Sequence, residues 1–418
     1  MKSLVFDIET DGLLLELTKF HVGYTYCIET KEYTRFLHAD DLMDELGTAD
    51  VVVGHNILGF DMPALTKLTG KELVQAKYID TLTLSRLAYY DKDISFSHSL
   101  DAHGERLGYP KGSHSDWSKY SPEMDEYCKR DVEVTYKLYQ HLLRKTRNWL
   151  PDEALQLEQD VQKIITQQYI NGWKFDIKKA QQLHIELTGE LEQAEKELFK
   201  VFTPKYLPKG KVTKLKKSFR RNGVYTVGDR QSIELTQFKP GSGKHIVWWV
   251  ELLYGKQNWT LTDKGTPRTD SDTLKKMFED KEWAEPLLHY QEVKKLLGQL
   301  ADGDNAWLKK VGDDGRIHGS ANILGAVTGR FTHSNPNLAQ VPSVRAYKGK
   351  ESRSLFTVPN GYKLVGCDAS GLELRTLSHY LARHDGGQYG KKLIEEDIHT
   401  ANQTAAGLPT RDNAKTFI

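Results

Sequence analysis

The sequence has few cysteines, no long apolar segment and almost no net charge. Its three cysteines, Cys27, Cys128 and Cys367, are scattered and odd in number, which argues against a disulfide framework and favours free thiols in a reducing cytosol. No run approaches the roughly 18 apolar residues of a membrane span, and carboxylates stand near the N-terminus where a signal peptide needs an apolar core. The formal net charge of +1 excludes a generally basic nucleic-acid coat, so a polyanion would have to bind local patches. These absences predict a cytoplasmic protein without a membrane partner.

The length and hydrophobic content are those of a multidomain globular protein. A chain of 418 residues is long enough for two or three domains, and 39% hydrophobic residues can supply their cores.

Two carboxylates lie together on the first predicted strand. Residues 4–9 alternate between apolar and acidic, which places Asp7 and Glu9 on one face of the strand. These two side chains repel each other unless a cation lies between them. A second strand, residues 51–53, leads through Asn56 to Asp61, which from the residues alone is either the N-cap of a helix or a metal ligand.

A predicted helix that begins near residue 121 carries a tyrosine and a fourth acidic residue. Ser121 and Pro122 are typical of a helix start, and Tyr127 and Asp131 then lie one turn apart on one face. Taken alone, this pair would be an ordinary solvated or half-buried helix face.

Taken together, these positions resemble the DEDDy 3′-5′ exonuclease family, whose signature is Asp-x-Glu, then Asp, then Tyr-x-x-x-Asp. The matching residues are Asp7, Glu9, Asp61, Tyr127 and Asp131. The resemblance implies two Mg²⁺ ions held by the four carboxylates, with Mn²⁺ as a substitute, because hard cations prefer oxygen ligands. It also implies that Tyr127 orients the attacking water and that Asn56 contacts the substrate strand. Asp80 is interpreted as a structural helix cap.

Residues 151–310 predict a helical arm with a basic tip. Helices are expected over residues 153–170 and 176–202, and a long antiparallel return helix over residues 273–300. The stretch 205–230 between them is strongly basic and contains interleaved aromatic residues, so it is either a solvated loop or a phosphate contact. The apolar segment 246–250 is expected to pack.

The last hundred residues contain a succession of motifs that are similar to those of the family A (DNA polymerase I-like) polymerases, in the replicative branch encoded by T-odd podophages. They include Thr328-Gly-Arg330, Pro336-Asn-Leu-Ala-Gln340, Asp368-Ala-Ser-Gly-Leu-Glu-Leu-Arg375 and Asp397-Ile-His-Thr400. A strand over residues 363–367 is expected to deliver Asp368 at its end, where a carboxylate could hold both Mg²⁺ ions of nucleotidyl transfer.

The resemblance assigns a role to each matching residue. Glu373 would shape the sugar pocket and His399 would lie near the incoming nucleotide or primer end. Arg330 and Gln340 would reach the minor groove, where every base pair offers an acceptor at the same place. Arg411 and Lys415, on a helix that begins near Thr410, would grip the triphosphate.

Two departures from the family concern partners. In the family, the helix that carries Arg411 and Lys415 belongs to the fingers and continues further, whereas this sequence stops after Ile418. The second metal-binding carboxylate of the palm, in a His-Asp-Glu motif, is also missing. We therefore expect a second polypeptide that carries the rest of the fingers and palm. The segment 205–238 is much shorter than the thumb insertion through which phage relatives recruit host thioredoxin, which argues against thioredoxin binding.

The predicted fold is an α/β and α+β multidomain chain. An RNase H-like exonuclease domain with a mixed sheet is expected over residues 1–150, a helical thumb over 151–310, and a partial palm and start of fingers over 311–418. The predicted function is the N-terminal polypeptide of a split or truncated family A polymerase with proofreading, which binds primer-template, single-stranded DNA and dNTP in the cytoplasm of a host cell. Two alternatives remain: a stand-alone exonuclease with a vestigial polymerase half, and a non-catalytic primer-template scaffold.

Overall fold

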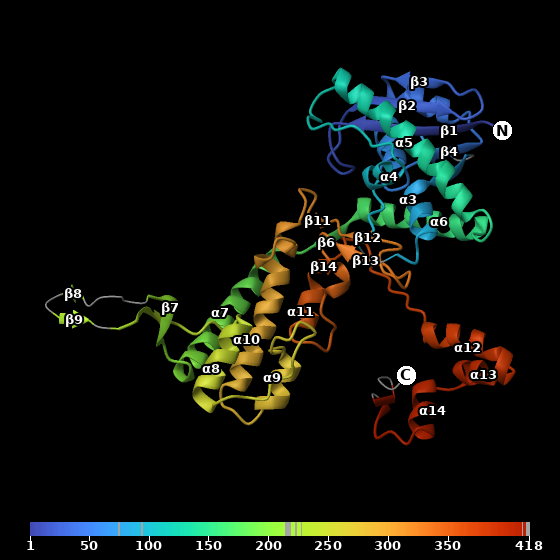
Figure 1. The fold of residues 1–418 in the computed structure, drawn as a ribbon. Coiled ribbons are helices and arrows are strands. Elements are labelled where there is room, and N and C mark those ends of the chain that lie inside the picture. The colour runs from blue at the N-terminus through green and yellow to red at the C-terminus, as the bar shows by residue number, and fades with distance from the viewer. Residues whose placement is uncertain are drawn as a thin grey trace. The chain divides into compact units, whose positions relative to one another are not determined.

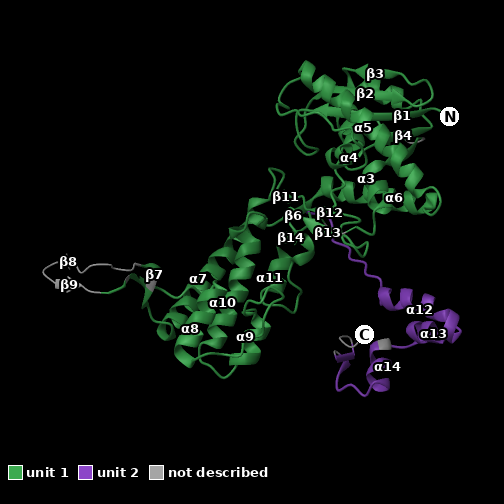
Figure 2. Ribbon diagram, viewed as in Figure 1, with its two compact units in different colours: residues 1–358 green, residues 359–418 purple. Residues whose placement is uncertain are grey.

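The structure is a computed structural model. It describes residues 1–73, 76–92, 95–213, 219–221, 224–226, 228–411 and 413–414, so the predicted phosphate contacts Lys214, Lys216, Lys217 and Lys415 lie outside the described residues. The chain divides into two compact units, Met1–Val358 and Pro359–Ile418 (Figure 2). The domain boundaries predicted near residues 150 and 310 fall inside the first unit and stay predictions.

Helices and strands of the described residues are labelled in Figure 1. The strands are β1 Ser3–Thr10, β2 Phe20–Cys27, β3 Tyr33–Phe36, β4 Val51–Gly54, β5 Lys77–Asp80, β6 Trp173–Phe175, β7 Lys205–Thr213, β8 Phe219–Arg221, β9 Val224–Thr226, β10 Arg230–Thr236, β11 Arg316–Ile317, β12 Ser320–Asn322, β13 Thr332–Ser334 and β14 Phe356–Thr357. The helices are α1 Ala39–Leu46, α2 Asp61–Thr69, α3 Thr81–Ala88, α4 Leu100–Arg106, α5 Pro122–Thr146, α6 Asp152–Asn171, α7 Ile177–Val201, α8 Gly243–Tyr254, α9 Ser271–Phe278, α10 Ala284–Leu297, α11 Gly349–Ser354, α12 Leu372–Asp385, α13 Gln388–Glu395 and α14 Ile398–Ala405. None of the helices in the described part of the chain has the length and apolar character that a membrane crossing requires.

A five-stranded mixed sheet organises the N-terminal part of the first unit. Its strand order is β3-β2-β1-β4-β5, with β2 antiparallel to β1 and with β4 parallel to both β1 and β5. Leu4, Phe6 and Ile8 of β1 pack on the face that α1 and α2 cover. Val5 packs on the opposite face against α5, so the central strand is buried on both sides. The strand predicted over residues 4–9 is therefore confirmed.

Local capping signals fix the start of α5, the helix that faces β1. The Ser121 hydroxyl accepts a hydrogen bond from the Met124 N–H at 3.2 Å, and Pro122 occupies the first helical position, where a missing N–H costs nothing. The predicted helix start is confirmed. The face of α5 that meets the sheet is set by its apolar residues, including Val132 and Leu138, which share a core cluster with Val5.

Two long helices, α7 and α10, form the arm. Leu183 and Leu187 near the start of α7 pack against Leu296 and Leu297 near the end of α10. Leu198 at the other end of α7 packs in the cluster that contains Trp283, at the start of α10. The predicted antiparallel pair is therefore confirmed, and so is the packing of segment 246–250, whose Trp249 has no exposed surface.

The single return helix predicted over residues 273–300 is wrong, because the structure has two helices there, α9 and α10. Pro286 is the third residue of α10. A proline has no N–H and its ring collides with the preceding turn, so it is accommodated in the first turn of a helix and not in its interior. The helix therefore ends before residue 279 and begins again at Ala284.

The basic stretch of the arm is an antiparallel ribbon where it is described. β7 pairs with β10, and β8 with β9. The Lys209 ammonium on β7 lies 2.7 Å from the Glu234 carboxylate on β10. Part of the positive charge that the sequence places at the tip is therefore neutralised within the ribbon.

The second unit contains α12, α13 and α14 around a small core of Leu374 and Leu393. The strand predicted over residues 363–367 is wrong: these residues have no regular secondary structure, and Val365 is 85% exposed. A strand exists only when its backbone groups pair with a neighbour. In the described part of this unit no strand is present to provide that neighbour.

Candidate active site

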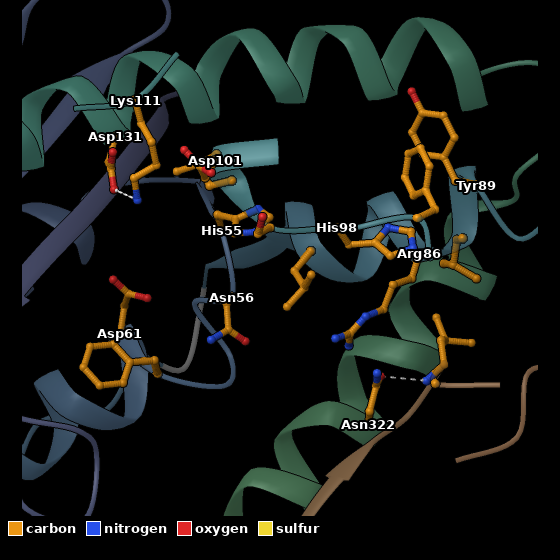
Figure 3. Close-up of a pocket in the computed structure, with 18 of the residues that line it drawn as sticks. His55, Asn56, Asp61, Arg86, Tyr89, His98, Asp101, Lys111, Asp131 and Asn322 are labelled. Carbon is orange, nitrogen blue, oxygen red and sulfur yellow. Dashed lines mark hydrogen bonds and ion pairs between the residues drawn. The ribbon is translucent and has the colours of Figure 1, made fainter. Parts of the chain in front are cut away.

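The five residues with the exonuclease-like pattern line one cavity. Asp7 and Glu9 come from β1, Asp61 from the first turn of α2, and Tyr127 and Asp131 from α5. The cavity has a volume of about 750 Å³. In Figure 3 the side chain of Asp61, from α2, and that of Asp131, from α5, point into the same open space. The structure thus brings together residues that lie more than a hundred positions apart in the sequence.

Asp61 is not the N-cap of α2, the alternative that the sequence left open. Phe60 occupies the N-cap position, and Asp61 is the first helical residue. Its residue surface is only 4% exposed. A carboxylate in the first turn of a helix is stabilised by the positive end of the helix dipole, and this one lines the cavity.

Burial and mutual repulsion shift the protonation of this carboxylate cluster. Burial first, and then the charges of Asp131 and Asp61, raise the pKa of Glu9 to about 9. Burial is also the largest cause that raises the pKa of Asp61 to about 7 and that of Asp131 to about 6. The pKa of Asp7 is likewise well above its ordinary range because of burial and the charge of Glu9. Burial and mutual repulsion therefore disfavour ionisation of all four carboxylates unless a cation compensates their charge.

The donor atoms fit a hard divalent cation. One oxygen of Asp131, Oδ1, is buried and has no hydrogen-bond partner among the described residues. Such an orphaned oxygen is costly unless a ligand satisfies it. The ligand atoms of Asp7, Glu9 and Cys128 lie within 4.8 Å of one another. Burial raises the pKa of the Cys128 thiol, which donates to the Asp7 carbonyl at 3.4 Å, so it stays a neutral neighbour of the oxygen ligands.

Aromatic side chains from the loop between α4 and α5 hold Tyr127. The Trp117 ring meets the Tyr127 ring edge-on at 5.5 Å between centroids. The Trp117 carbonyl in turn makes a 3.1 Å hydrogen bond with His21 of β2, which anchors the loop to the sheet. A side chain on Gly112 would begin 3.4 Å from the Tyr127 ring, so the loop passes close to it. The position of the Tyr127 ring is thus set by packing.

Asp80 is confirmed as a structural cap. Its carboxylate accepts hydrogen bonds from the backbone N–H groups of Leu82 and Leu58, at 2.9 and 3.0 Å, and of Asn56 at 3.0 Å. Asn56 has a φ of 63°, in the left-handed region that asparagine tolerates better than most residues. The buried carboxylate therefore holds the loop that presents Asn56 to the cavity.

The residues predicted to serve a polymerase site are mostly exposed. Arg330 and Gln340 lie on the surface of the first unit, and Asp368 and Glu373 on that of the second. The Asp368 carboxylate follows the segment that forms no strand, so its predicted placement at a strand end is not realised.

Two sets of polar contacts involve the residues of the second unit that were predicted to bind nucleotide, or their neighbours. Asp397 caps α14 by accepting from the His399 N–H at 3.2 Å. The Arg411 guanidinium donates to both carboxylate oxygens of Asp397, at 2.7 and 3.1 Å. The Thr410 hydroxyl accepts from the Asn413 N–H at 3.1 Å, as expected of a helix start.

Sequence reasoning missed Lys111, Trp117 and Cys128. The two loop residues follow no period, so neither helical nor strand patterning indicates where their side chains point. Cys128 adjoins Tyr127 on α5, and the signal that could have found it is its position one turn before Val132 on the sheet-facing side of the helix. Only the fold reveals that all three lie beside the carboxylates.

Comparison with known proteins places the chain in a family. The sequence model of the family described as "DNA polymerase family A" matches residues 211–415. The chain is 34% identical to the DNA-directed DNA polymerase of Escherichia phage T7 over 531 aligned positions, which cover 99% of this chain and 74% of that protein. The identity and the coverage of both chains have the same values for the DNA-directed DNA polymerase of Enterobacteria phage T3. This chain belongs to DNA polymerase family A.

A solved structure supports the family A fold. The POL domain of Pol1 from M. smegmatis, in complex with DNA primer-template and dNTP, superimposes with a TM-score of 0.72 at 19% identity. The superposition covers 100% of this chain and 66% of the M. smegmatis chain, just under two thirds of its length. The mixed α/β architecture expected from the sequence is therefore confirmed at the level of the family A fold.

The raised pKa values predict how the stability of the metal-free family A chain depends on pH. Between about 4.5 and about 9 the folded protein holds a proton on Glu9 that the unfolded chain has released. The free energy of unfolding should therefore fall as the pH rises through this window. A divalent cation should reverse the trend, because it stabilises the ionised carboxylates that high pH produces. Thermal unfolding from pH 5 to pH 9, with EDTA or with Mg²⁺, measures both effects.

Glu9→Gln is the control for this pH dependence, since the amide cannot titrate. The variant should show a flatter decline in EDTA and a smaller gain with Mg²⁺. A metal-free wild-type protein that becomes more stable from pH 5 to pH 9 would contradict the account.

Proposed function

We propose that this family A chain contains a metal-dependent 3′-5′ DNA exonuclease centre at the cluster of Asp7, Glu9, Asp61 and Asp131. The observation that carries the proposal is the convergence of these four carboxylates and Tyr127 on one cavity. Removal of a nucleotide from a 3′ end requires an oriented water and compensation of the negative charge that develops on the phosphate. A buried cluster of carboxylates that holds divalent cations can orient the water and compensate this negative charge.

Each residue has a distinct part in this proposal. The four carboxylates would hold two Mg²⁺ ions, with Mn²⁺ as a substitute. When bound, such ions activate water and stabilise the leaving 3′ oxygen. The Tyr127 hydroxyl, held by the Trp117 ring, would accept or donate a hydrogen bond that orients the water without ionising. Asn56, at the cavity wall, would bind the single-stranded substrate.

The sheet topology supports an RNase H-like exonuclease domain over residues 1–150. A central β1 flanked by one antiparallel and one parallel neighbour gives the mixed sheet that the sequence led us to expect. The helical arm is then the thumb over residues 151–310. Residues 311–418 are the palm and the start of the fingers.

We also propose that this chain supplies part of a template-directed DNA polymerase site. Membership of DNA polymerase family A and the motif that begins at Asp368 support this second activity. Asp368 would hold Mg²⁺, Glu373 would shape the sugar pocket, and His399 would lie near the dNTP. Arg411 and Lys415 would bind its triphosphate, for which Arg411 would have to leave Asp397.

The exposed apolar surface of the second unit supports a further polypeptide as partner. Leu364, Val365, Leu377 and Ile394 are each between 46% and 85% exposed. Surfaces of this kind mark protein contacts. We propose that a further polypeptide covers this surface and pairs with the segment 363–367, in the cytoplasm of a host cell.

The exonuclease proposal predicts loss of activity in the double variant Asp7→Ala, Glu9→Ala. Wild-type protein should shorten a single-stranded DNA labelled at its 5′ end, in Mg²⁺ or Mn²⁺, from the 3′ terminus. Removing two ligands should reduce the rate by about a thousandfold or more, because the metal contributes several kcal/mol to the transition state. Gel analysis of product lengths measures rate and polarity together.

Asp40→Ala, Asp44→Ala is the matched control, since these carboxylates pair with Lys71 on the surface, at 3.2 and 2.6 Å. It should digest DNA at the wild-type rate. Digestion that persists in the Asp7, Glu9 variant, or that needs no divalent cation, would show that the centre lies elsewhere.

The polymerase proposal predicts that Arg330→Ala weakens binding of a primer-template duplex. A donor in the minor groove contacts an acceptor that every base pair presents, so the loss should be about tenfold and independent of sequence. Fluorescence anisotropy with labelled duplexes of two unrelated sequences measures it. Arg144→Ala, at an exposed position on α5, should bind as the wild type does. Equal affinities of wild type and Arg330→Ala would remove Arg330 from the proposed site.

A further inference from the structure

A lysine lies inside the carboxylate cluster. The Lys111 ammonium is 2.6 Å from Asp131 Oδ2, and only 17% of its side chain is exposed. The same ammonium lies 4.7 Å from the centre of the Tyr127 ring. Figure 3 shows Lys111 reaching from its loop into the space that Asp61 faces on the other side. The position is one that a cation bound by the carboxylates would also seek.

The charge of Lys111 acts on several carboxylates at once. It lowers the pKa of Asp7, Glu9 and Asp131, and in each case opposes the larger effect of burial. Burial lowers the pKa of Lys111 itself, but the charge and hydrogen bond of Asp131 outweigh burial and hold it above its ordinary value. The ammonium is thus charged, and it partly neutralises the cluster in the metal-free protein.

The backbone that carries Lys111 is clamped to α5. The Arg130 guanidinium donates to the Pro110 carbonyl at 3.0 Å and lies 3.4 Å over the Tyr109 ring. The Tyr109 hydroxyl donates to the Glu133 carboxylate at 2.7 Å. Residues on both sides of Asp131 therefore fix the chain just before Lys111, so that its side chain alone reaches into the carboxylate cluster.

We propose that Lys111 is a built-in counter-ion that occupies the cation position of the carboxylate cluster and is displaced from Asp131 when a divalent cation binds. This inference rests on the proposed exonuclease centre, and in it Lys111 is a positioning residue. It keeps Asp131 in place and limits repulsion among buried carboxylates while the metal is absent. Its presence also weakens cation binding, because the incoming ion must compete with a charge that is already there.

An ion pair with a purely structural role should have no effect on cation binding, and the chain contains such a pair for comparison. Lys348 has the same side-chain exposure, 17%, and its ammonium lies 2.5 Å from the Glu186 carboxylate. Glu186 is 52% exposed and belongs to α7, away from the carboxylate cluster. Removing Lys348 should lower stability equally with and without a divalent cation, and should leave cation binding unchanged.

The experiment measures Mn²⁺ binding to the full chain after removal of metal with EDTA. Isothermal titration calorimetry compares wild type with Lys111→Met, Lys111→Gln, Lys111→Arg and Lys348→Met, and thermal unfolding is recorded for each with and without Mn²⁺. Loss of the charge in Lys111→Met and Lys111→Gln should tighten Mn²⁺ binding by about tenfold or more. Both should melt at a lower temperature than wild type in EDTA, and Mn²⁺ should remove most of the difference. Lys111→Arg should bind Mn²⁺ as the wild type does.

The outcomes separate this inference from the function on which it rests. Wild-type binding of Mn²⁺ together with equal or weaker binding by the two neutral variants would overturn the counter-ion role and leave the exonuclease centre standing. Lys111→Gln can still donate a hydrogen bond to Asp131, so it tests the charge alone even if Lys111→Met fails to fold. Mn²⁺ binding that is unchanged in Asp7→Ala, Glu9→Ala, or that is absent from wild type and from both neutral Lys111 variants, would overturn the proposed centre itself.

Discussion

Four carboxylates that face one another inside a folded protein are the constraint around which the first unit is arranged. Glu9, Asp61 and Asp131 are each less than a tenth exposed, and water can offset little of their charge. Each additional negative charge in such surroundings costs several kcal/mol unless it is paired or protonated. The raised pKa values, the ammonium of Lys111 and the orphaned oxygen of Asp131 are three consequences of the same arrangement.

The fold places this arrangement on rigid elements. β1 is the central strand of its sheet and is buried on both faces, so the backbone under Asp7 and Glu9 has little freedom. α5 packs across that strand through Val132 and Leu138, which turns the neighbouring Asp131 toward it. Sites built on strands and helices hold their geometry better than sites on loops. Lys111 is the exception, because it comes from the loop between α4 and α5.

The elements that the sequence predicted correctly are those with local signals. Alternation predicted β1, and Ser121 with Pro122 predicted the start of α5, since a cap involves residues only three positions apart. The failures depend on distant partners. Segment 363–367 has strand-like residues but no described neighbour to pair with, and no period in the sequence indicates that Lys111 points at Asp131. The four carboxylates could be singled out because their residue types match a family pattern, whereas the lysine beside them could not.

The central claim is that these carboxylates form one divalent-cation centre, and anomalous diffraction tests it most directly. Crystals of the full chain soaked in Mn²⁺, with data collected at the manganese absorption edge, locate the ions without reference to activity. The account predicts anomalous density enclosed by carboxylate oxygens of Asp7, Glu9, Asp61 and Asp131, with the Lys111 ammonium withdrawn from Asp131. Density confined to other acidic residues, or none at this cluster under saturating Mn²⁺, would contradict it.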